Sequence, residues 1–380
     1  MSEPRVKSGA NTGTDAATDA GSDGDRAGGA AAVGDEARAA ATAATGANDL
    51  ADTPLVARLF AKLADGEFHS GEVLAADLQV TRSAIWKAAG ALRDLGATVN
   101  AVRNRGYRLP GTAEPLDAAR ITELLGVTAR PHVARVDAAW TLGSTNTVLM
   151  ERPYPAVACG EALLAEYQTA GRGRRGRTWV APPGGSICLS FSWMFAEVPR
   201  DLGALGLVIG VCAMEALRDL GVVGIGLKWP NDLLVENRKL GGILIELRAE
   251  SGGPACVVIG IGLNVALGAA LLEQISATGL APIDLVSAGL KGGRRNEVAA
   301  GLISSFVRGL LDFGRAGLKP FVQRWMDVDA LRGKPIAVAG ADVTTKGIAR
   351  GIDLDGALLV ETPQGLLKFI SGDVSVRADI

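Results

Sequence analysis

The chain of 380 residues carries a formal net charge of −2, and 48% of its residues are hydrophobic. This length suits two or three domains rather than one small core. The slightly acidic balance gives no overall attraction to nucleic acid or anionic membranes, so any such contact needs a local basic patch.

Cysteine, histidine and apolar patterns predict a soluble, cytoplasmic protein without a metal site or a membrane partner. The four cysteines, Cys159, Cys188, Cys212 and Cys256, lie far apart in apolar contexts. Such cysteines are typical of buried free thiols in a reducing compartment. His69 and His132 do not cluster with them, so zinc is not expected. The longest strongly apolar run, 202–214, is too short to span a bilayer.

The N-terminal 50 residues predict a disordered, mildly acidic tail. They are Ala, Gly, Thr and Asp with almost no large apolar side chains, so nothing offsets the entropy of folding. The tail lacks the apolar core of a signal peptide and the Arg-rich character of a transit peptide.

Residues 53–110 predict a winged helix-turn-helix. Leu55, Leu59 and Leu63 recur at helical spacing. Ser70 and Thr81 are N-cap residues for helices expected over 71–78 and 82–95. Strands at 98–102 and 107–109 flank a turn and form the wing. This pattern favours DNA binding, and a packing or interaction module with solvated charges is the alternative.

The candidates for DNA contact are basic residues of the third helix and the wing. They are Arg82, Lys87, Arg93, Arg103, Arg105 and Arg108. Trp86 stands in the same helix, where a polar side chain is the more usual reader of base edges. We expect Trp86 to pack inward.

Beyond a linker at 110–115, residues 116–330 predict an α/β region. Helices are expected at 118–125, 202–220 and 296–311, and strands at 162–168, 186–193, 226–229, 239–248 and 256–264. From residue 331 to residue 380, short β runs separated by glycines predict a small closed barrel.

The run Gly171-Arg172-Gly173-Arg174-Arg175-Gly176-Arg177, called the arginine loop below, predicts an anion-binding loop that is mobile when empty. Its glycines and like charges disfavour a helix or strand. Guanidinium groups hold phosphate and carboxylate oxygens bidentately. The alternating run 186–193 that follows predicts a half-buried strand, so we expect the loop to hang from a sheet edge as an active-site cover.

Further polar groups predict a pocket. Lys239 precedes a run that must be buried, and the bare backbone of Gly241-Gly242 beside it admits a ligand. Gly260-Ile261-Gly262-Leu263-Asn264 repeats this theme. Ser144-Thr145-Asn146 and Gln168 supply neutral hydrogen-bonding groups of the kind that orient an uncharged polar ring.

Three of these motifs together closely resemble biotin protein ligases, in particular the bifunctional form that also represses the biotin operon. They are the arginine loop with Trp179, the turn Lys228-Trp229-Pro230-Asn231-Asp232, and the run Arg238-Lys239-Leu240-Gly241-Gly242-Ile243-Leu244. The resemblance extends from about Pro54 to Arg377. It implies an α+β multidomain protein: a winged helix-turn-helix at 53–110, a catalytic domain related to class II aminoacyl-tRNA synthetases at 116–330, and an SH3-like β-barrel at 331–380.

The resemblance also implies a reaction and the residues that serve it. Biotin and ATP would give biotinyl-5′-adenylate, and biotin would then pass to a lysine of a biotin carboxyl carrier protein. Expected biotin-binding residues are Ser144, Thr145, Asn146, Gln168, Gly171, Arg172, Gly173, Arg174, Lys239, Gly242, Gly260 and Gly262. Expected ATP- or adenylate-binding residues are Arg174, Arg175, Arg177, Trp179, Lys228, Asn231, Asn264 and Arg377. Lys239 and Arg174 are the expected catalytic residues.

Biotin, ATP and Mg²⁺ are therefore the expected small molecules, with the metal carried by the ATP phosphates because no dedicated carboxylate cage is evident. Operator DNA and a second copy of the chain, paired when adenylate is bound, are the further expected partners. Two alternatives remain: a ligase whose winged segment does not bind DNA, and a non-catalytic biotin-sensing regulator. A lipoate ligase is disfavoured because the arginine loop has the biotin-type sequence.

Overall fold

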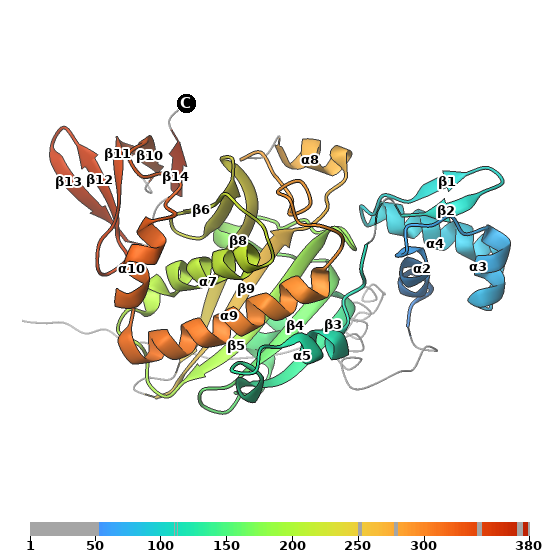
Figure 1. Ribbon diagram of the computed structural model, residues 1–380, viewed down its shortest axis with the longest axis horizontal. Helices are drawn as coiled ribbons and strands as arrows, with labels where there is room; N and C mark the ends of the chain where they lie inside the picture. The colour runs from blue at the N-terminus through green and yellow to red at the C-terminus, as the bar shows by residue number, and fades with distance from the viewer. Residues whose placement is uncertain are drawn as a thin grey trace, which may run out of the picture. The chain divides into compact units, whose positions relative to one another are not determined.

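A computed structural model describes residues 53–109, 111, 113–249, 253–276, 280–339, 344–370 and 375–378 (Figure 1). The disorder expected for residues 1–50 lies outside the described residues.

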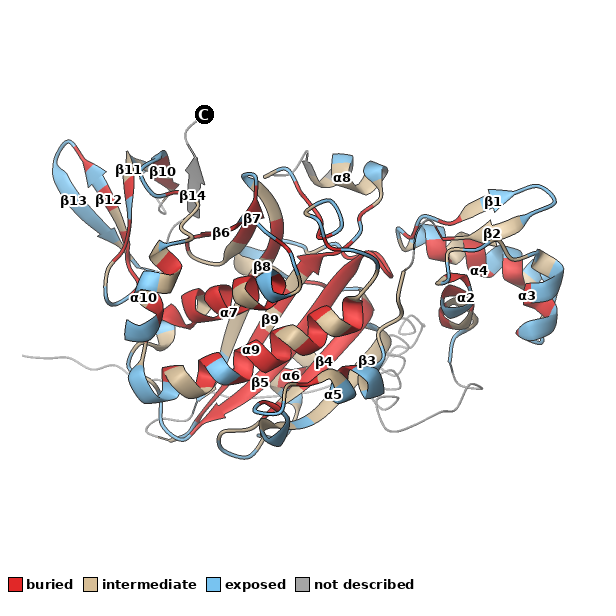
Figure 2. Ribbon diagram, viewed as in Figure 1, coloured by how far each residue is buried: buried red, intermediate tan, exposed pale blue. Residues whose placement is uncertain are grey.

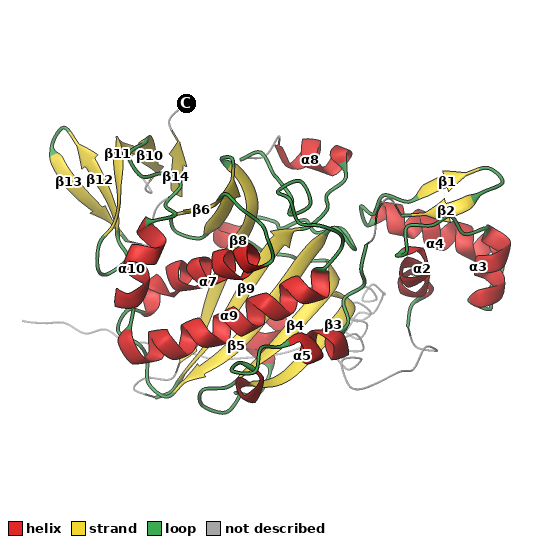
Figure 3. Ribbon diagram, viewed as in Figure 1, coloured by secondary structure: helices red, strands yellow, loops and turns green. Residues whose placement is uncertain are grey.

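The first described segment has the expected three helices and a two-stranded wing (Figure 3). The elements are α2 (Leu55–Leu63), α3 (Gly71–Asp77), α4 (Arg82–Asp94), β1 (Asn100–Val102) and β2 (Gly106–Arg108). Both predicted N-caps are confirmed. The Ser70 hydroxyl accepts a hydrogen bond from Val73 N at 3.1 Å, and the Thr81 hydroxyl accepts one from Ala84 N at 3.2 Å. The wing strands pair antiparallel.

The expectation that Trp86 packs inward is wrong, because this side chain is 65% exposed. The buried stripe of α4 consists of Ile85, Ala88, Ala89 and Leu92, which follow the helical repeat. Position 86 lies about 100° around the helix from position 85, so its side chain points to solvent.

A seven-stranded sheet forms the centre of the described chain. Its strands are β3 (Val133–Leu142), β4 (Gly160–Gln168), β5 (Ser186–Phe195), β6 (Ile225–Lys228), β7 (Asp232–Val235), β8 (Arg238–Ala249) and β9 (Ala255–Asn264). They follow the order β3-β4-β5-β9-β8-β7-β6, in which β3 and β4 pair parallel and the other neighbours pair antiparallel. Beyond β6, Leu227 exchanges backbone hydrogen bonds with Val328 and Ala330, so this edge is covered.

The expectation of a half-buried strand at 186–193 is also wrong. Every residue of β5 is buried, because β5 lies inside the sheet with structure on both faces (Figure 2). Helices α7 (Leu205–Asp219) and α9 (Arg295–Ala316) lie across one face (Figure 1). Helix α6 (Thr145–Glu151) packs against β4, β5 and β9. Small polar residues alternate in β5 because they serve the interior of the protein and not solvent.

The remaining helices are short. They are α5 (Ala118–Leu124), α8 (Ala269–Ser276) and α10 (Lys319–Met326), with 3-10 turns η1 (Arg130–His132), η2 (Arg174–Gly176) and η3 (Leu202–Ala204). The single helix expected at 202–220 is therefore η3 followed by α7. No helix in the described ranges is long and apolar enough to cross a membrane.

The C-terminal segment forms a five-stranded antiparallel sheet, in the order β13-β12-β11-β10-β14. Its strands are β10 (Pro335–Ala339), β11 (Thr344–Ile352), β12 (Leu358–Thr362), β13 (Gly365–Phe369) and β14 (Ser375–Ala378). The short strands expected from residue 331 onward are confirmed. Closure into a barrel stays a prediction, because β13 and β14 lie at the two ends of the described sheet. Trp229 of the central segment donates its indole N–H to Gly356 O at 3.0 Å, which ties the β6–β7 turn to this sheet.

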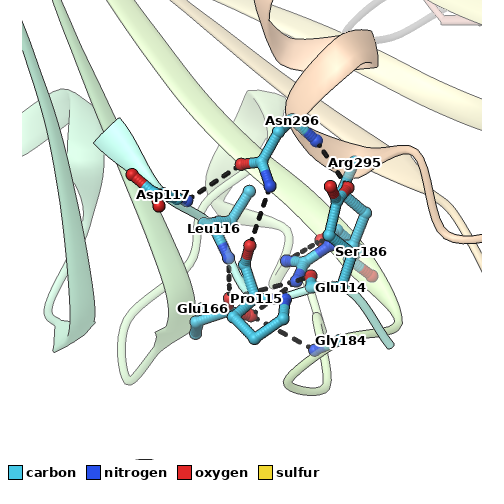
Figure 4. Close-up of polar contacts among 9 residues, drawn as sticks. All are labelled: Glu114, Pro115, Leu116, Asp117, Glu166, Gly184, Ser186, Arg295 and Asn296. Atoms are coloured by element: carbon cyan, nitrogen blue, oxygen red, sulfur yellow. Dashed lines mark hydrogen bonds and ion pairs between the residues drawn. The ribbon is translucent and has the colours of Figure 1, made fainter. Parts of the chain in front are cut away.

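A buried ion pair joins the start of α9 to the central sheet and to the segment before α5 (Figure 4). Arg295 has no exposed side-chain surface and contacts the Glu166 carboxylate at 2.9 Å. Its guanidinium also donates to Ser186 O at 2.7 Å and to Glu114 O at 2.7 Å. Glu166 in turn accepts from Leu116 N at 2.7 Å. Each buried charge therefore has both a counter-charge and backbone partners.

Replacing Arg295 with Met should lower the free energy of unfolding by about 3–5 kcal/mol, because Glu166 would remain as an uncompensated buried charge. Urea denaturation measures this loss. Arg315→Ala is the control, since the pair of Arg315 with Asp312 is exposed and should contribute less than about 1 kcal/mol. Equal losses in the two variants would contradict this account of the buried pair.

Candidate active site

A cavity of about 500 Å³ opens where α6, the arginine loop, the β6–β7 turn and the strands β8 and β9 meet. Nearly all of the predicted site residues line it. These are Ser144, Thr145, Asn146, Gln168, Arg172, Gly173, Arg174, Arg175, Arg177, Trp179, Lys228, Asn231, Lys239, Gly242, Gly260, Gly262 and Asn264. The fold thus brings these predicted residues, separated by up to 120 positions in the chain, together in one cavity.

Two predicted residues do not line the cavity. Gly171 is buried behind it, where a Cβ atom would lie 2.5 Å from Trp179 O, so glycine is required for packing and not for ligand access. Arg377 belongs to β14, where it pairs with Ala337, but its side chain lies outside the described part of the structure.

One end of the cavity carries a neutral hydrogen-bond network. Gln168 Oε1 accepts from Thr145 N at 2.8 Å and from the Thr145 hydroxyl at 3.1 Å. Ser190 donates to Thr145 Oγ1 at 2.7 Å and lies 2.5 Å from Asn146 Oδ1. Ser190 was missed in the sequence, although alternation along β5 places it on the same face as Cys188, which lines the cavity.

Glu246 holds this network through Asn146. Its role was also missed in the sequence. Its carboxylate accepts from Asn146 Nδ2 at 2.7 Å and approaches Arg172 Nη2 at 3.4 Å. A carboxylate only accepts hydrogen bonds, so it sets which way the Asn146 amide points. The signal was available, since Gly242, Leu244 and Glu246 alternate on one face of β8 and the first two line the cavity.

Close backbone approach shapes the wall of the cavity that β9 forms. A Cβ atom on Gly260 would lie 2.4 Å from Asn146 Oδ1, and one on Gly262 would lie 2.4 Å from the Trp179 indole. Alanine at either position would therefore displace a cavity residue. These two glycines share a face of β9 because they are two residues apart.

Lys239 reaches the cavity and forms an ion pair with Asp232 at 2.7 Å. The two side chains are 29% and 16% exposed, and the Lys239 ammonium lies 6.0 Å from the centre of the Trp179 ring. Asp232 was quoted in the sequence motif but given no role. Its position makes it the residue that holds the Lys239 ammonium at the cavity wall.

The arginine loop is folded back on itself. Gly173 N donates to Arg177 O at 2.7 Å, and Trp179 N donates to Gly171 O at 2.9 Å. Arg175 adopts a φ of 58°, so the turn depends on a left-handed non-glycine residue. The loop connects β4 and β5, which are neighbours inside the sheet. The expected attachment at a sheet edge is therefore wrong.

Arg174 points from this loop toward the β6–β7 turn, where its Nη1 lies 3.4 Å from Asn231 Oδ1. Burial lowers the pKa of the Arg174 guanidinium, Arg175 lowers it further, and Asp232 opposes them. A cation that is partly desolvated beside another cation gains from an anionic ligand. Asn231 and Asn264 instead use their amide N–H groups on the backbone carbonyls of Ile243 and Ile283.

The expected DNA-contacting residues lie on the first segment but differ in their surroundings. Arg82 pairs with Glu72 at 3.0 Å, and Arg93 donates to Val99 O at 3.1 Å. Arg105 and Arg108 stack on the Phe68 ring at 4.1 and 4.5 Å. Lys87 and Arg103 are exposed. Arg93 therefore already uses its Nε–H group to bind the chain that follows α4.

The chain matches three sequence families. Residues 140–264 match the biotin/lipoate A/B protein ligase family, residues 57–108 match an HTH domain, and residues 332–377 match the biotin protein ligase C-terminal domain.

Similar proteins cover nearly the same length. The bifunctional ligase/repressor BirA of Salmonella typhimurium is 40% identical over 86% of this chain and 99% of its own length. The Escherichia coli protein of the same name is 39% identical, over 86% and 98%. Among solved structures, a biotin protein ligase from Aquifex aeolicus in complex with biotin and ATP is 27% identical. It aligns with a TM-score of 0.56 over 65% of this chain and all of its own.

Cys188 lines the cavity but should be unreactive. Burial raises the pKa of this thiol from 9.0 to about 12, so at pH 8 its thiolate fraction should be about a thousandfold lower than that of an ordinary cysteine. Iodoacetamide at pH 8 followed by peptide mass spectrometry should label the less buried Cys159 well before Cys188. Unfolding in urea should equalise the two. Rapid labelling of Cys188 in the native protein would show that its environment favours the thiolate.

Proposed function

Because this chain belongs to the family of bifunctional biotin ligase/repressors, we propose that its cavity joins biotin to ATP and that its winged segment carries the product signal to DNA. The protein activates biotin as biotinyl-5′-adenylate, releasing pyrophosphate, and transfers biotin to a lysine of a biotin carboxyl carrier protein. The observation that carries this assignment is the convergence of the arginine loop and Lys239 on a cavity whose other end bears neutral hydrogen-bonding groups.

The first step needs alignment of anions and not a protein nucleophile. A biotin carboxylate oxygen attacks the α-phosphorus of ATP, and the bond from that phosphorus to the bridging oxygen breaks as pyrophosphate leaves. Mg²⁺ would be carried by the ATP phosphates and would neutralise part of their charge. Lys239 and Arg174 supply positive charge to the carboxylate and the phosphate oxygens. The raised pKa of the Cys188 thiol supports this direct route, because a protonated thiol does not compete as a nucleophile.

The neutral end suits the ureido ring of biotin. That ring has one carbonyl acceptor and two N–H donors. Thr145 and Asn146 line this end of the cavity, where Ser190 holds both of them and Glu246 fixes the orientation of the Asn146 amide. The glycines of β9 let Asn146 and Trp179 lie against the backbone beside the ring, and the arginine loop would cover the ring. Trp179, Lys228 and Asn231 would lie nearer the adenylate.

In the second step the carrier lysine attacks the acyl carbon of the adenylate, the bond between that carbon and the phosphate oxygen breaks, and AMP leaves. The amine loses its proton to solvent. Lys239 again neutralises the phosphate oxygens as AMP departs. This division of roles among the residues is part of the proposal, as are the domain boundaries at 53–110, 116–330 and 331–380 and a cytoplasmic location.

Adenylate-driven pairing would connect the two activities. Of the two edges of the central sheet, that of β6 is covered by Val328 and Ala330, which leaves the outer edge of β3 among the described residues for pairing with a second copy. Two winged segments on one two-fold-symmetric operator would double the phosphate contacts. A non-catalytic regulator is disfavoured because Lys239 and all four arginines of the arginine loop line the cavity.

Replacing Lys239 with Ala should lower the rate of adenylate formation about a hundredfold, the effect of losing about 3 kcal/mol of charge stabilisation at the reacting phosphate. Pyrophosphate release in the presence of biotin, ATP and Mg²⁺ measures the rate. Lys291→Ala, at an exposed position outside the cavity, is the control and should keep the full rate. Urea denaturation accompanies both, because Asp232 loses its partner. Near-normal adenylation by a folded Lys239→Ala protein would remove Lys239 from the mechanism.

Biotin plus ATP should shift the protein from monomer to dimer in sedimentation velocity, and tighten its binding to promoter DNA of biotin genes. The DNA affinity should fall steeply with salt, since phosphate contacts release counterions. Arg172→Ala should weaken the ligand-driven shift while leaving the unliganded mass unchanged. No change in mass together with DNA binding no tighter than to random duplex would remove the repressor role and leave the ligase.

A further inference from the structure

The outward face of α4 carries an exposed tryptophan between two cations. All six tryptophans of the chain lie in the described residues, and Trp86 alone among them is exposed, at 65%. Arg82 and Lys87 flank it within a turn and are exposed as well. An indole left in water has a cost in free energy, which points to a surface that is covered when a partner binds.

The charge of this segment favours DNA as that partner. Residues 53–109 contain eight basic and five acidic residues, whereas the whole chain has a net charge of −2. The first described segment thus carries a basic excess that the whole chain lacks. Phosphates complement that charge, and a helix-turn-helix places the N-terminal part of its second helix against base edges. Trp86 is the fifth residue of α4 and so lies in that part.

Space beside the indole permits close approach to a groove. Gly90 follows Trp86 by four residues, on the same face of α4. A Cβ atom at Gly90 would have no heavy atom within 4 Å, so the helix surface next to Trp86 is open. A flat aromatic side chain next to a bare stretch of helix can lie along the floor of the major groove.

An indole offers an extended apolar face and a single N–H donor, so it cannot make the bidentate hydrogen bonds by which Asn or Gln reads adenine. The apolar group that the major groove presents is the C5-methyl of thymine, which no other DNA base carries. We propose that Trp86 is a specificity-determining residue that recognises a thymine methyl group in each operator half-site. This inference rests on the DNA binding proposed above and adds to it the class of base that is read.

The test removes only the methyl group. A random duplex library is first enriched with wild-type protein in the presence of biotin and ATP. Each thymine of the enriched sequence is then replaced singly by deoxyuridine, which keeps base pairing and lacks the C5-methyl. At one position per half-site, deoxyuridine should weaken wild-type binding about fourfold, the effect of one methyl group no longer buried. Trp86→Ala should bind about tenfold more weakly and show no further loss with deoxyuridine at that position.

Lys87→Ala is the matched control, at the exposed position next to Trp86 in α4. It should weaken binding to enriched and random DNA alike, through a lost phosphate contact, and keep the wild-type sensitivity to deoxyuridine. Adenylate formation and the unfolding midpoint should match wild type in both variants, because neither side chain belongs to the cavity or to a buried core.

Two outcomes would overturn the inference while leaving DNA binding in place. One is a Trp86→Ala protein with wild-type sensitivity to every deoxyuridine. The other is a Trp86→Ala protein with normal DNA binding but altered sedimentation, which would make Trp86 a protein contact. Failure of the wild-type protein to enrich any sequence would instead contradict the proposed DNA binding itself.

Discussion

The buried pair between Arg295 and Glu166 is the constraint on which the site depends. Glu166 lies two residues before Gln168 at the end of β4, and Arg295 binds Ser186 O at the start of β5. The arginine loop connects these two strands, so one guanidinium group fixes both ends of the chain stretch that contains it. Since two buried charges are costly to separate, the loop can change its shape without its attachment points moving.

Opposite charges share the cavity in a way that suits a charged substrate. The cations Arg172 and Lys239 each meet a carboxylate, Glu246 and Asp232 respectively. These pairs hold the cations in position at little electrostatic cost when no anion is bound. An entering carboxylate or phosphate therefore meets groups already arranged, and binding energy is not used to order them. Glu246 also binds Asn146, so the Arg172 pair adjoins the hydrogen-bond network proposed to recognise the ring, whereas the Lys239 pair involves none of its residues.

Local signals in the sequence predicted much of this arrangement. Ser70 and Thr81 cap the helices that they were expected to cap, since capping depends on residues within one turn. Lys239 beside the pair Gly241-Gly242 likewise indicated the cavity, because these residues are adjacent in the sequence. Sequence reasoning missed the roles of Asp232, Glu246 and Ser190. Each lies on a strand, and the order of strands in the sheet decides which side chains it meets. The burial of β5 depends on packing partners distant in the chain, so alternation alone could not decide it. The exposure of Trp86 follows instead from the local repeat of α4, whose buried stripe leaves out position 86.

The wall formed by Gly260 and Gly262 has a consequence for how this family of sites can change. Glycine has no side chain to shorten, so a mutation at either position on β9 can reduce the volume of the cavity but cannot increase it. Acceptance of a bulkier acid must come from lining residues with large side chains, such as Trp179, which lies over Gly262, and Leu244, which pairs with Gly260 from β8. Selectivity is thus asymmetric. A single larger side chain anywhere in the lining, including on β9, can narrow the range of acids. A wider range requires a smaller side chain at a position other than these two glycines.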